Sequence, residues 1–543
     1  MSNLVKVGIL LDEYNELRNW ELRLIQEIVN AQDLELSLLI EDGRLIAITS
    51  PEDTKKHVLA ENILRLQFKF EEKLFGHKST INKEELFSSL SGVEVIKLKP
   101  EGRNCYDYFS NSDSKLVKKC GLDVILKFTF AKISGEILDL AKYGVWTFDH
   151  LDKQFDSPVD LGFWENVHKE SSIPVAIKRV GLKNDKVIDI TNFNRHFSSV
   201  KTNKLVNEAA VSLLLKNIRR LKADDVKLNY LSVDLNAHKG YPGTLMALKY
   251  CSQVYNFLFS RFVERLSYRL FSTRSNCWTL FVGKGNILEY DISKLNPMVL
   301  PKDEFWADPF LFPYKGELYV FFENYSYKAN RAKISCGKIE GNQLIDIKDV
   351  LDLDYHLSYP YIIEEDGEIY LMPESNKQEK ISIYKCRKFP DEWELYSTAF
   401  EGELVADAFF YNDEQKQKWL FVNKRNPNTT FANELFIYKV DSLKMEKLIP
   451  HKNNPVIIDA RTARNGGAIF RYNNDIYRPS QSNIMGIYGR NININKITKL
   501  SIEEYEEETI RIVKPDFHKN LVATHHLHQI KDYFVIDAAY KMK

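Results

Sequence analysis

The chain has 543 residues, of which 44% are apolar, and its 75 lysines and arginines balance its 75 aspartates and glutamates. Such a composition is typical of a globular protein, and the length predicts two to four domains rather than one hydrophobic core. Because the net charge is zero, no overall field favours binding to nucleic acid. The composition therefore excludes a disordered chain and gives no support to a nucleic-acid partner.

Nothing in the sequence indicates secretion, a membrane span or a metal site. The segment Met1–Trp20 lacks the basic start and the small-residue cleavage site of a signal peptide. No apolar run reaches the roughly 18 residues that a membrane span needs. The six cysteines are far apart, without the short spacings of zinc sites, and we interpret them as reduced core thiols. We therefore expect a cytoplasmic protein that binds no metal and needs no cofactor.

The first half of the chain alternates apolar strands with helices. Strands are expected at residues 5–11, 34–40, 121–128 and 144–150, and helices at 16–30 and 134–143. Such alternation predicts an α/β domain with a mostly parallel sheet and helices on its faces, which we place at residues 1–200. No G-x-G-x-x-G follows the first strand, so the pattern does not support a dinucleotide site.

Residues 201–275 have a helical pattern and are predicted to link the two halves of the chain. This segment ends in an aromatic and basic stretch, 245–274, with a single acid, Glu264. Its cations are Lys249, Arg261, Arg265, Arg269 and Arg274. The sequence favours a linker helix packed between domains. It also leaves open a contact between this stretch and an anionic membrane surface.

The second half, 276–543, repeats a hairpin in which an apolar strand, a turn and a second strand end on a polar residue. The copies begin at Asp308, Tyr359, Asp407, Asn465 and, more weakly, His525. The first three copies lie about 50 residues apart, which suits the blades of a propeller better than a sandwich. We therefore predict an all-β five-bladed propeller. The lone strand Cys277–Gly285 is expected to complete its last blade.

In a propeller the equivalent positions of the repeats meet around one axis, and each hairpin returns its second strand to the same rim. The strand starts are Asp308, Tyr359, Asp407, Arg464, His525 and His526, and the strand ends are Glu323, Glu374, Asn423, Gln481 and Asp537. Such a ring of carboxylates and other polar groups suits a polyhydroxylated ligand, either a glycan or a nucleotide-linked sugar. Aromatic faces for the sugar are expected from Trp306, Tyr359, Tyr361 and Tyr488. A pair of carboxyl groups at the opening of the channel is also the catalytic arrangement that cleaves glycosidic bonds.

The motifs "FWADPF", "SYPYIIEEDGEIYLMPES", "ADAFFYND", "ARNGGAIF", "YRPSQ" and "THHLHQ" carry a family resemblance. This half resembles the five-bladed propellers of arabinanases, xylosidases and invertases. More closely, it resembles the N-terminal propeller of plant glucosamine inositolphosphorylceramide transferases and their bacterial relatives. The resemblance to the glycosidases implies that Asp308 is the general base or nucleophile. The second and third blades depart from the glycosidase pattern, so the expected partner of Asp308 is Glu374 or Asp407.

The stretch "GLDVILKFTFAKISGEILDLAKYGVWTFDH" resembles the hydrolase and transferase domain of methionyl-tRNA and sugar N-formyltransferases. In that family an Asn, a His and a later Asp perform the transfer. Here Thr147 and Asp149 occupy the Asn and His positions, His150 lies one residue further, and Lys183 stands where the Asp belongs. The resemblance therefore implies a formyltransferase-like α/β domain that has lost its catalytic residues.

Three functional hypotheses follow. The first is a carbohydrate-active protein of bacterial surface-polysaccharide biosynthesis, glycosidase-like or glycan-transferring, that binds its ligand at the channel mouth. The second is an active sugar N-formyltransferase, which alone would require formyltetrahydrofolate. The third is a glycan-binding scaffold without turnover.

Overall fold

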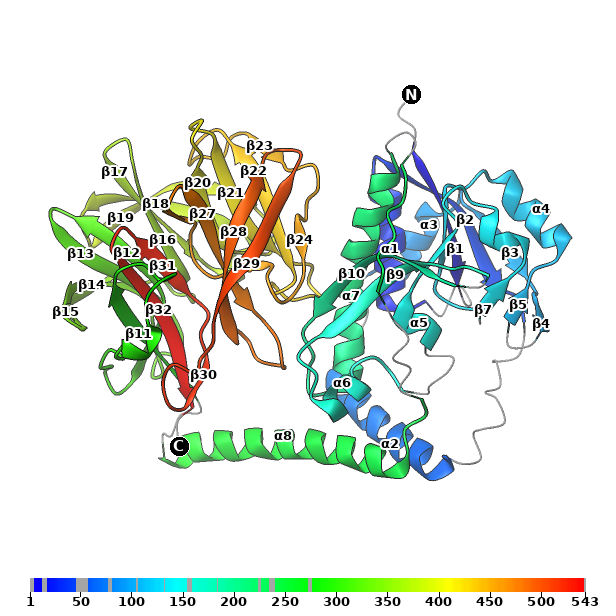
Figure 1. The fold of residues 1–543 in the computed structure, drawn as a ribbon, viewed down its shortest axis with the longest axis horizontal. Coiled ribbons are helices and arrows are strands. Elements are labelled where there is room, and N and C mark those ends of the chain that lie inside the picture. Colours follow the sequence, from blue (N-terminus) through cyan, green and yellow to red (C-terminus); the bar gives the residue numbers. More distant parts are fainter. Residues whose placement is uncertain are drawn as a thin grey trace. The chain divides into compact units, whose positions relative to one another are not determined.

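The computed structural model divides the chain into two compact units, Met1–Leu258 and Phe259–Lys543, shown in Figure 1. Each unit is described by itself. The structure describes residues 4–11, 17–44, 57–76, 81–103, 106–130, 132–153, 159–182, 184–222, 226–233, 240–271 and 276–541.

The first unit is built on one sheet, which among the described residues has seven strands in the order β10-β9-β8-β6-β1-β2-β3. These are β1 (Val5–Leu11), β2 (Leu34–Asp42), β3 (Glu94–Leu98), β6 (Val124–Lys127), β8 (Val145–Phe148), β9 (Ile173–Arg179) and β10 (Lys186–Phe193). The strands from β3 to β8 pair in parallel, whereas β9 and β10 are antiparallel. The predicted mostly parallel α/β sheet is therefore confirmed.

The helices of this unit lie between its strands. They are α1 (Asn19–Asn30), α2 (Val58–Phe75), α3 (Lys83–Ser89), α4 (Asn111–Lys119), α5 (Asp149–Lys153), α6 (Phe163–His168) and α7 (Ser199–Arg219), with the 3-10 turns η3 (Glu136–Asp139) and η4 (Arg220–Lys222). A small sheet joins β4 (Glu101–Arg103), β5 (Tyr106–Tyr108) and β7 (Lys132–Ser134). The strands carry runs of buried aliphatic residues because helices cover the sheet.

The helix predicted at 134–143 is wrong. Only the four residues of η3 are helical there, as a 3-10 turn. Gly135 and Gly144, with φ of 98° and 78°, bracket the segment in conformations that an α-helix does not use. At Gly144 a side chain would also collide with Arg179, because a Cβ atom would lie 2.5 Å from its Nε. The apolar spacing reflects burial of Ile137 and Leu138 from a turn rather than from a helix.

A long helix, α8 (Thr244–Phe271), follows the sheet, and a buried cluster of polar groups attaches its first half to α2 and α7. The Tyr250 hydroxyl donates to Glu71 Oε1 at 2.8 Å and accepts the Ser199 N–H at 2.7 Å. The Ser198 hydroxyl donates to the same carboxylate at 2.5 Å. Burial, followed by the charge of Glu71, raises the pKa of Tyr250. None of the helices in the described part of the chain is long and apolar enough to cross a bilayer.

Residues 276–541 of the second unit are all described and form five antiparallel sheets, with two 3-10 turns, η5 (Ile292–Lys294) and η6 (Asn376–Gln378). The first sheet holds β12 (Glu304–Tyr314), β13 (Glu317–Ser326), β14 (Arg331–Glu340) and β15 (Gln343–Leu351). The second holds β16 (Ser358–Glu365), β17 (Glu368–Glu374), β18 (Ile381–Lys388) and β19 (Glu392–Ala399). The third holds β20 (Val405–Asn412), β21 (Lys418–Lys424), β22 (Glu434–Val440), β23 (Leu448–Pro450) and β24 (Ile457–Ile458). The fourth holds β25 (Arg464–Asn465), β26 (Phe470–Tyr472), β27 (Asp475–Ser482), β28 (Asn491–Leu500) and β29 (Tyr505–Val513).

The fifth sheet joins the start of the unit to its end. It holds β11 (Asn276–Lys284), β30 (Leu521–Ala523), β31 (Leu527–Ile530) and β32 (Tyr533–Lys541), and β11 pairs with β32 along its whole length. The inner strands contact one another in sequence around the unit, β12 with β16, β16 with β20 and β20 with β25. Strand β26 of the fourth sheet then contacts β31 of the fifth, and β31 returns to β12. These contacts close a circle of five sheets, a β-propeller. The predicted role of the lone strand Cys277–Gly285 is confirmed.

The cysteines are free, as expected, in the part of the chain that the structure describes. Only Cys336 of the five described there is fully buried, so the interpretation of all of them as core thiols is wrong. Cys105 lies outside the described residues.

The closing strand generates a stability prediction. Leu280 on β11 is fully buried against Val320, Phe322 and Val535. We expect Leu280→Ala to lower the free energy of unfolding by about 2–5 kcal/mol, because it removes methyl groups from a packed core shared by two sheets. Urea unfolding followed by fluorescence measures the loss. The control Val299→Ala, at a residue 74% exposed, is expected to change the free energy by less than about 0.5 kcal/mol. An equal effect of both substitutions would contradict closure by β11.

Candidate functional site

Three strand starts predicted from the repeats share an unusual backbone conformation. Asp308, Tyr359 and Asp407 have φ of 48°, 45° and 49°, and strand pairing is interrupted at each of them. A left-handed conformation costs a residue with a side chain about 1–2 kcal/mol, so neighbouring groups must hold it. The first three blades therefore have the same bulge at the start of the inner strand.

The neighbouring blade supplies much of that support. A strand-end side chain of one blade accepts the backbone N–H of a strand-start residue in the next blade. The bonds run from Asp308 N to Asp537 Oδ2 (3.0 Å), from Asp407 N to Glu374 Oε2 (3.3 Å) and from Asn465 N to Asn423 Oδ1 (2.8 Å). Tyr359 is held instead by Asp308 Oδ2, at 3.2 Å from its N–H. These bonds bring the predicted strand starts and strand ends together at one rim.

The fourth blade departs from the predicted alignment by one residue. The strand-end residues Glu323, Glu374, Asn423 and Gln481 pair with Ala307, Ser358, Ala406 and Arg464. Asn465, and not Arg464, is therefore the equivalent of Asp308. The Arg464 side chain nevertheless reaches the rim, where its Nε donates to Asp407 Oδ2 at 2.5 Å. Asn465 is fully buried and donates its side-chain amide to the Asp407 carbonyl at 2.9 Å.

Asp308 lies at the centre of the charged groups. Its Oδ1 is 3.5 Å from His525 Nε2 and 3.5 Å from His526 Nδ1, and both histidines are buried. Burial alone would raise the pKa of Asp308. The charge of His525, a hydrogen bond from His526 and the charge of Arg464 oppose it and hold that pKa below its ordinary value. Asp308 is therefore a carboxylate at neutral pH.

Glu374 has the opposite electrostatic environment. Burial is the first cause that raises its pKa well above the ordinary value, and the nearby charge of Asp407 is the second. Arg464 acts in the other direction but is already paired with Asp407. Two carboxyl groups at one rim thus have pKa values displaced in opposite directions, which is the arrangement that assigns an acid and a base.

The other predicted residues line the same rim or support it. His525 Nδ1 lies 2.7 Å from the fully buried Asp537. Glu323 is buried and pairs with His356 Nε2 at 3.3 Å, and burial raises the pKa of this glutamate. Gln481 donates to the Asn465 carbonyl at 2.9 Å and serves the framework.

Only one of the four aromatic residues expected to present a ring to a sugar is exposed. Tyr488 is 48% exposed, and the Arg464 guanidinium lies 4.9 Å from its ring centre. Trp306, Tyr359 and Tyr361 are buried, so the expectation that they present faces to a ligand is wrong. Their apolar rings fill the spaces between blades, as the contact between Tyr361 and Phe310 illustrates.

Sequence reasoning missed two residues of this rim. Trp278 on β11 is half-buried and stacks on the His525 ring at 4.1 Å. His356 precedes the second repeat and reaches Glu323. Trp278 could have been found from its place on the strand already assigned to the last blade, whereas no repeat signal marks His356.

One group of rim residues has the spacing of a cation site. Ligand atoms of Asp308, His525 and Asp537 lie within 4.8 Å of one another. However, Asp537 already accepts the N–H groups of Asp308, His525 and His526. We therefore interpret this group as a hydrogen-bonded charge cluster that orients His525.

The predicted formyltransferase positions of the first unit are occupied by structural hydrogen bonds. The Thr147 hydroxyl donates to the Lys127 carbonyl at 2.7 Å, and Asp149 Oδ1 accepts the Ala176 N–H at 3.0 Å. His150 Nε2 lies 2.8 Å from Asn207 Oδ1. Thr147, Asp149 and His150 are all buried. Lys183 lies outside the described residues.

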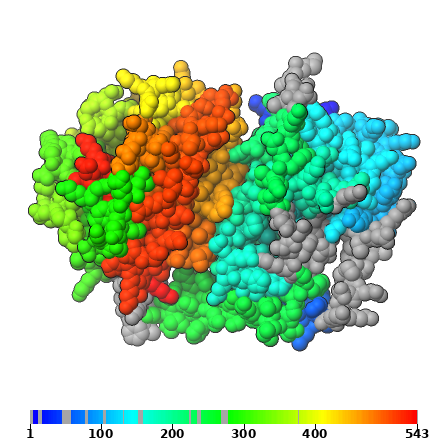
Figure 2. Space-filling model, viewed as in Figure 1, coloured from blue at the N-terminus to red at the C-terminus, as the bar shows by residue number. Residues whose placement is uncertain are grey.

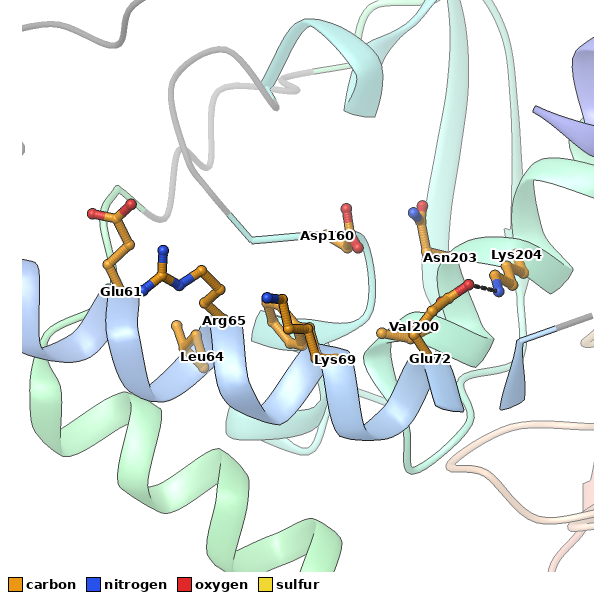
Figure 3. A pocket seen from close by; sticks show the side chains of 10 residues that line it. Glu61, Leu64, Arg65, Lys69, Glu72, Asp160, Val200, Asn203 and Lys204 are labelled. Carbon is orange, nitrogen blue, oxygen red and sulfur yellow. Dashed lines mark hydrogen bonds and ion pairs between the residues drawn. The ribbon is translucent and has the colours of Figure 1, made fainter. Parts of the chain in front are cut away.

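The first unit also contains a cavity of about 550 Å³ beside α2. Leu64, Phe68 and Val200 form its apolar lining, and Lys204 pairs with Glu72 at 2.6 Å on its edge. Figure 3 shows Asp160 across the cavity from Lys69. Burial raises the pKa of Asp160. One face of α2 therefore lines a cavity with both charged and apolar side chains.

Comparison with known proteins finds a family match in the repeat half of the chain. Residues 294–532 match the family model described as glucosamine inositolphosphorylceramide transferase 1, N-terminal. Glucosamine inositolphosphorylceramide transferase 1 of Oryza sativa subsp. japonica is 33% identical over 213 residues, 38% of this chain and 28% of that protein. Its namesake in Arabidopsis thaliana is 33% identical over 207 residues, 37% and 27% of the two chains. The chain spans less than a third of the length of these curated relatives.

Among solved structures, similar ones are a thermostable family-43 glycoside hydrolase and the catalytic domain of the Coprinopsis cinerea GH62 α-L-arabinofuranosidase. The first is 11% identical with a TM-score of 0.34, covering 44% of this chain and 90% of the other. The second is 9% identical with a TM-score of 0.34, covering 49% and 98%.

The charge cluster generates a pH prediction. Burial would lower the pKa of His525, but the carboxylates of Asp537 and Asp308 outweigh it and raise this pKa to about 9. Because the folded-state pKa exceeds the ordinary value of about 6.5, protonated His525 stabilises the fold fully below that pH and loses its contribution as pH rises through about 9. NMR of histidine-labelled protein measures the titration.

A matched pair of variants tests the cause of that shift. We expect Asp537→Asn to lower the pKa of His525, whereas Asp475→Asn, which removes a carboxylate paired with Lys496, leaves it unchanged. A His525 resonance that titrates near its ordinary pH in the wild-type protein would refute the assignment.

Proposed function

We propose that the propeller unit binds a carbohydrate at the rim formed by Asp308, Glu374, Arg464, Tyr488 and His525, and acts on a glycosidic bond there. The observation that carries this proposal is the arrangement of one rim, where Asp308 lies 3.5 Å from two buried histidines and Glu374 accepts the Asp407 N–H. These surroundings displace the pKa values of Asp308 and Glu374 in opposite directions. The family match to a propeller of sugar transferases supports the ligand class.

The chemistry follows from the two protonation states. Protonated Glu374 donates its proton to the leaving oxygen as the glycosidic bond breaks. Ionised Asp308 either removes a proton from the attacking water or attacks the anomeric carbon itself. A sugar hydroxyl in place of that water converts hydrolysis into glycan transfer. Asp407 is held by Arg464, so we assign it to positioning rather than to the acid–base pair.

The remaining rim residues suit recognition of the sugar. Tyr488 offers an exposed ring on which a sugar face can pack, and the Arg464 guanidinium beside it donates to hydroxyl or phosphate oxygens. His525 lies beside Tyr488, with ring centroids 5.3 Å apart, and Trp278 packs against the His525 ring. A glycan or a nucleotide-linked sugar satisfies these groups, and we place the activity in bacterial surface-polysaccharide biosynthesis on the basis of the resemblance.

We assign no formyl transfer to the first unit. The support is that Thr147, Asp149 and His150 are buried and engaged in hydrogen bonds within the fold. Formyltetrahydrofolate is therefore not part of the proposed reaction.

One observation favours a glycan-binding scaffold as a second candidate. Asp308 and Glu374, the proposed acid–base pair, both accept backbone N–H groups across blades, which is a sufficient reason for acids at this rim. The scaffold and the enzyme share a ligand class and differ only in turnover.

Turnover of p-nitrophenyl glycosides of pentoses, hexoses and glucosamine tests the proposal. We expect Asp308→Asn to lower turnover about 10²- to 10⁴-fold while oligosaccharide binding, measured by calorimetry, is kept. We expect Glu374→Gln to lower turnover less on these substrates than on natural glycosides, because nitrophenolate leaves without needing a proton from an acid.

The matched control is Asp349→Asn, which removes a half-exposed acid of the same unit that pairs with Lys333. It is expected to leave turnover unchanged. Glycan binding by the wild-type protein without turnover of any substrate would select the scaffold. Transfer of a labelled formyl group by the wild-type protein, abolished by Asp149→Ala, would replace both candidates.

A further inference from the structure

Helix α8 has two apolar faces on opposite sides. One face packs into the first unit through Ala247, Tyr250 and Val254, which are fully buried. The other is open, with exposed fractions of 74% at Leu245, 51% at Leu248 and 50% at Tyr255. At about 100° per residue these three positions fall within an arc of roughly 80°, so they form one stripe along the first half of the helix.

Helix α2 carries a second open stripe. Leu59, Leu66, Phe70 and Leu74 are exposed by 62%, 69%, 37% and 50% and lie on one side of the helix. Their spacing of seven and four residues keeps them apart from the buried positions, which include Ala60 and Leu64. The cavity described above uses a third side of the same helix.

The two stripes form one surface. The Phe70 and Tyr255 rings lie 5.8 Å apart and join α2 to α8. Beneath them, Tyr250 is hydrogen-bonded to Glu71, which fixes the two helices to each other. Figure 1 shows α2 beside the first half of α8, and Figure 2 shows α8 at the surface. We call these seven exposed side chains the apolar face. Soluble monomers rarely expose so many large apolar side chains together.

The charges around the apolar face are mainly positive. Lys73 on α2 and Lys249 on α8 are exposed. The part of α8 that belongs to the first unit, residues 244–258, contains no acid. On α2, Glu72 is neutralised by Lys204. An apolar stripe flanked by cations complements a bilayer with anionic headgroups.

We propose that the apolar face binds the surface of an anionic bilayer, with α2 and α8 lying in the plane of the headgroups. Neither helix is apolar enough to span the membrane, which is consistent with insertion of side chains only. This inference is independent of the function proposed for the propeller.

Sedimentation of the full-length protein with vesicles tests the inference. We expect binding to phosphatidylcholine vesicles that contain about one-third phosphatidylglycerol, and at least tenfold weaker binding to phosphatidylcholine alone. The double variant Leu245→Asp with Leu248→Asp, and the single variant Leu66→Asp on α2, should each weaken binding at least tenfold. Leu182→Asp is the matched control in the first unit, since Leu182 is 66% exposed outside the apolar face, and it should bind like the wild type.

A second measurement does not depend on loss of binding. Leu248→Trp and Leu182→Trp keep the residues apolar, and we expect brominated lipid to quench the added fluorescence only in the first. Failure of the wild-type protein to bind anionic vesicles would overturn the inference. An equal loss of vesicle binding in the Leu182→Asp control would also overturn the inference. A dimer that Leu66→Asp dissociates, without vesicle binding, would instead assign the apolar face to a second copy of the chain.

Discussion

The hydrogen bond between a strand-end side chain of one blade and the backbone N–H of the next blade is the interaction on which the propeller rim depends. It is made by Glu374, Asn423 and Asp537, which close three of the five junctions between blades. Two of these bonds hold the strand starts Asp308 and Asp407 at left-handed bulges, whereas Asn465 pairs with Ser480 in its sheet. The same polar side chains therefore build the ring and concentrate charge at its mouth.

Concentrating buried acids in this way is costly unless each is neutralised. Arg464 neutralises Asp407, and His525 and His526 form ion pairs with Asp308. Arg464 is paired with Asp407 rather than with Glu374, and burial raises the pKa of Glu374 well above its ordinary value. The unequal distribution of cations around the rim is what separates an acid from a base. A purely structural rim would have no need of that difference.

The repeats made most of the propeller predictable because each hairpin carries its own period-two pattern and its own polar ends. The closing strand was predictable from its position before the first repeat. The register of the fourth blade was not, because Arg464 and Asn465 are both polar and only strand pairing distinguishes them. Trp306 and Tyr361 look like ligand platforms in sequence, yet packing between blades buries them. In the first half, periodicity predicted the strands but mistook a buried 3-10 turn for a helix, and it did not reveal the stripe on α2, which emerges only beside α8.

The assignment of an acid and a base to this rim depends most directly on the protonation states of Asp308 and Glu374 in the folded protein. Carbon-13 NMR of the side-chain carboxyl groups, assigned with Asp308→Asn and Glu374→Gln, measures both titrations. We predict that Glu374 takes up its proton well above the ordinary pH of a glutamate and that Asp308 stays ionised below the ordinary pH of an aspartate. Two carboxyl groups that titrate together at ordinary values would contradict the assignment of an acid and a base to this rim.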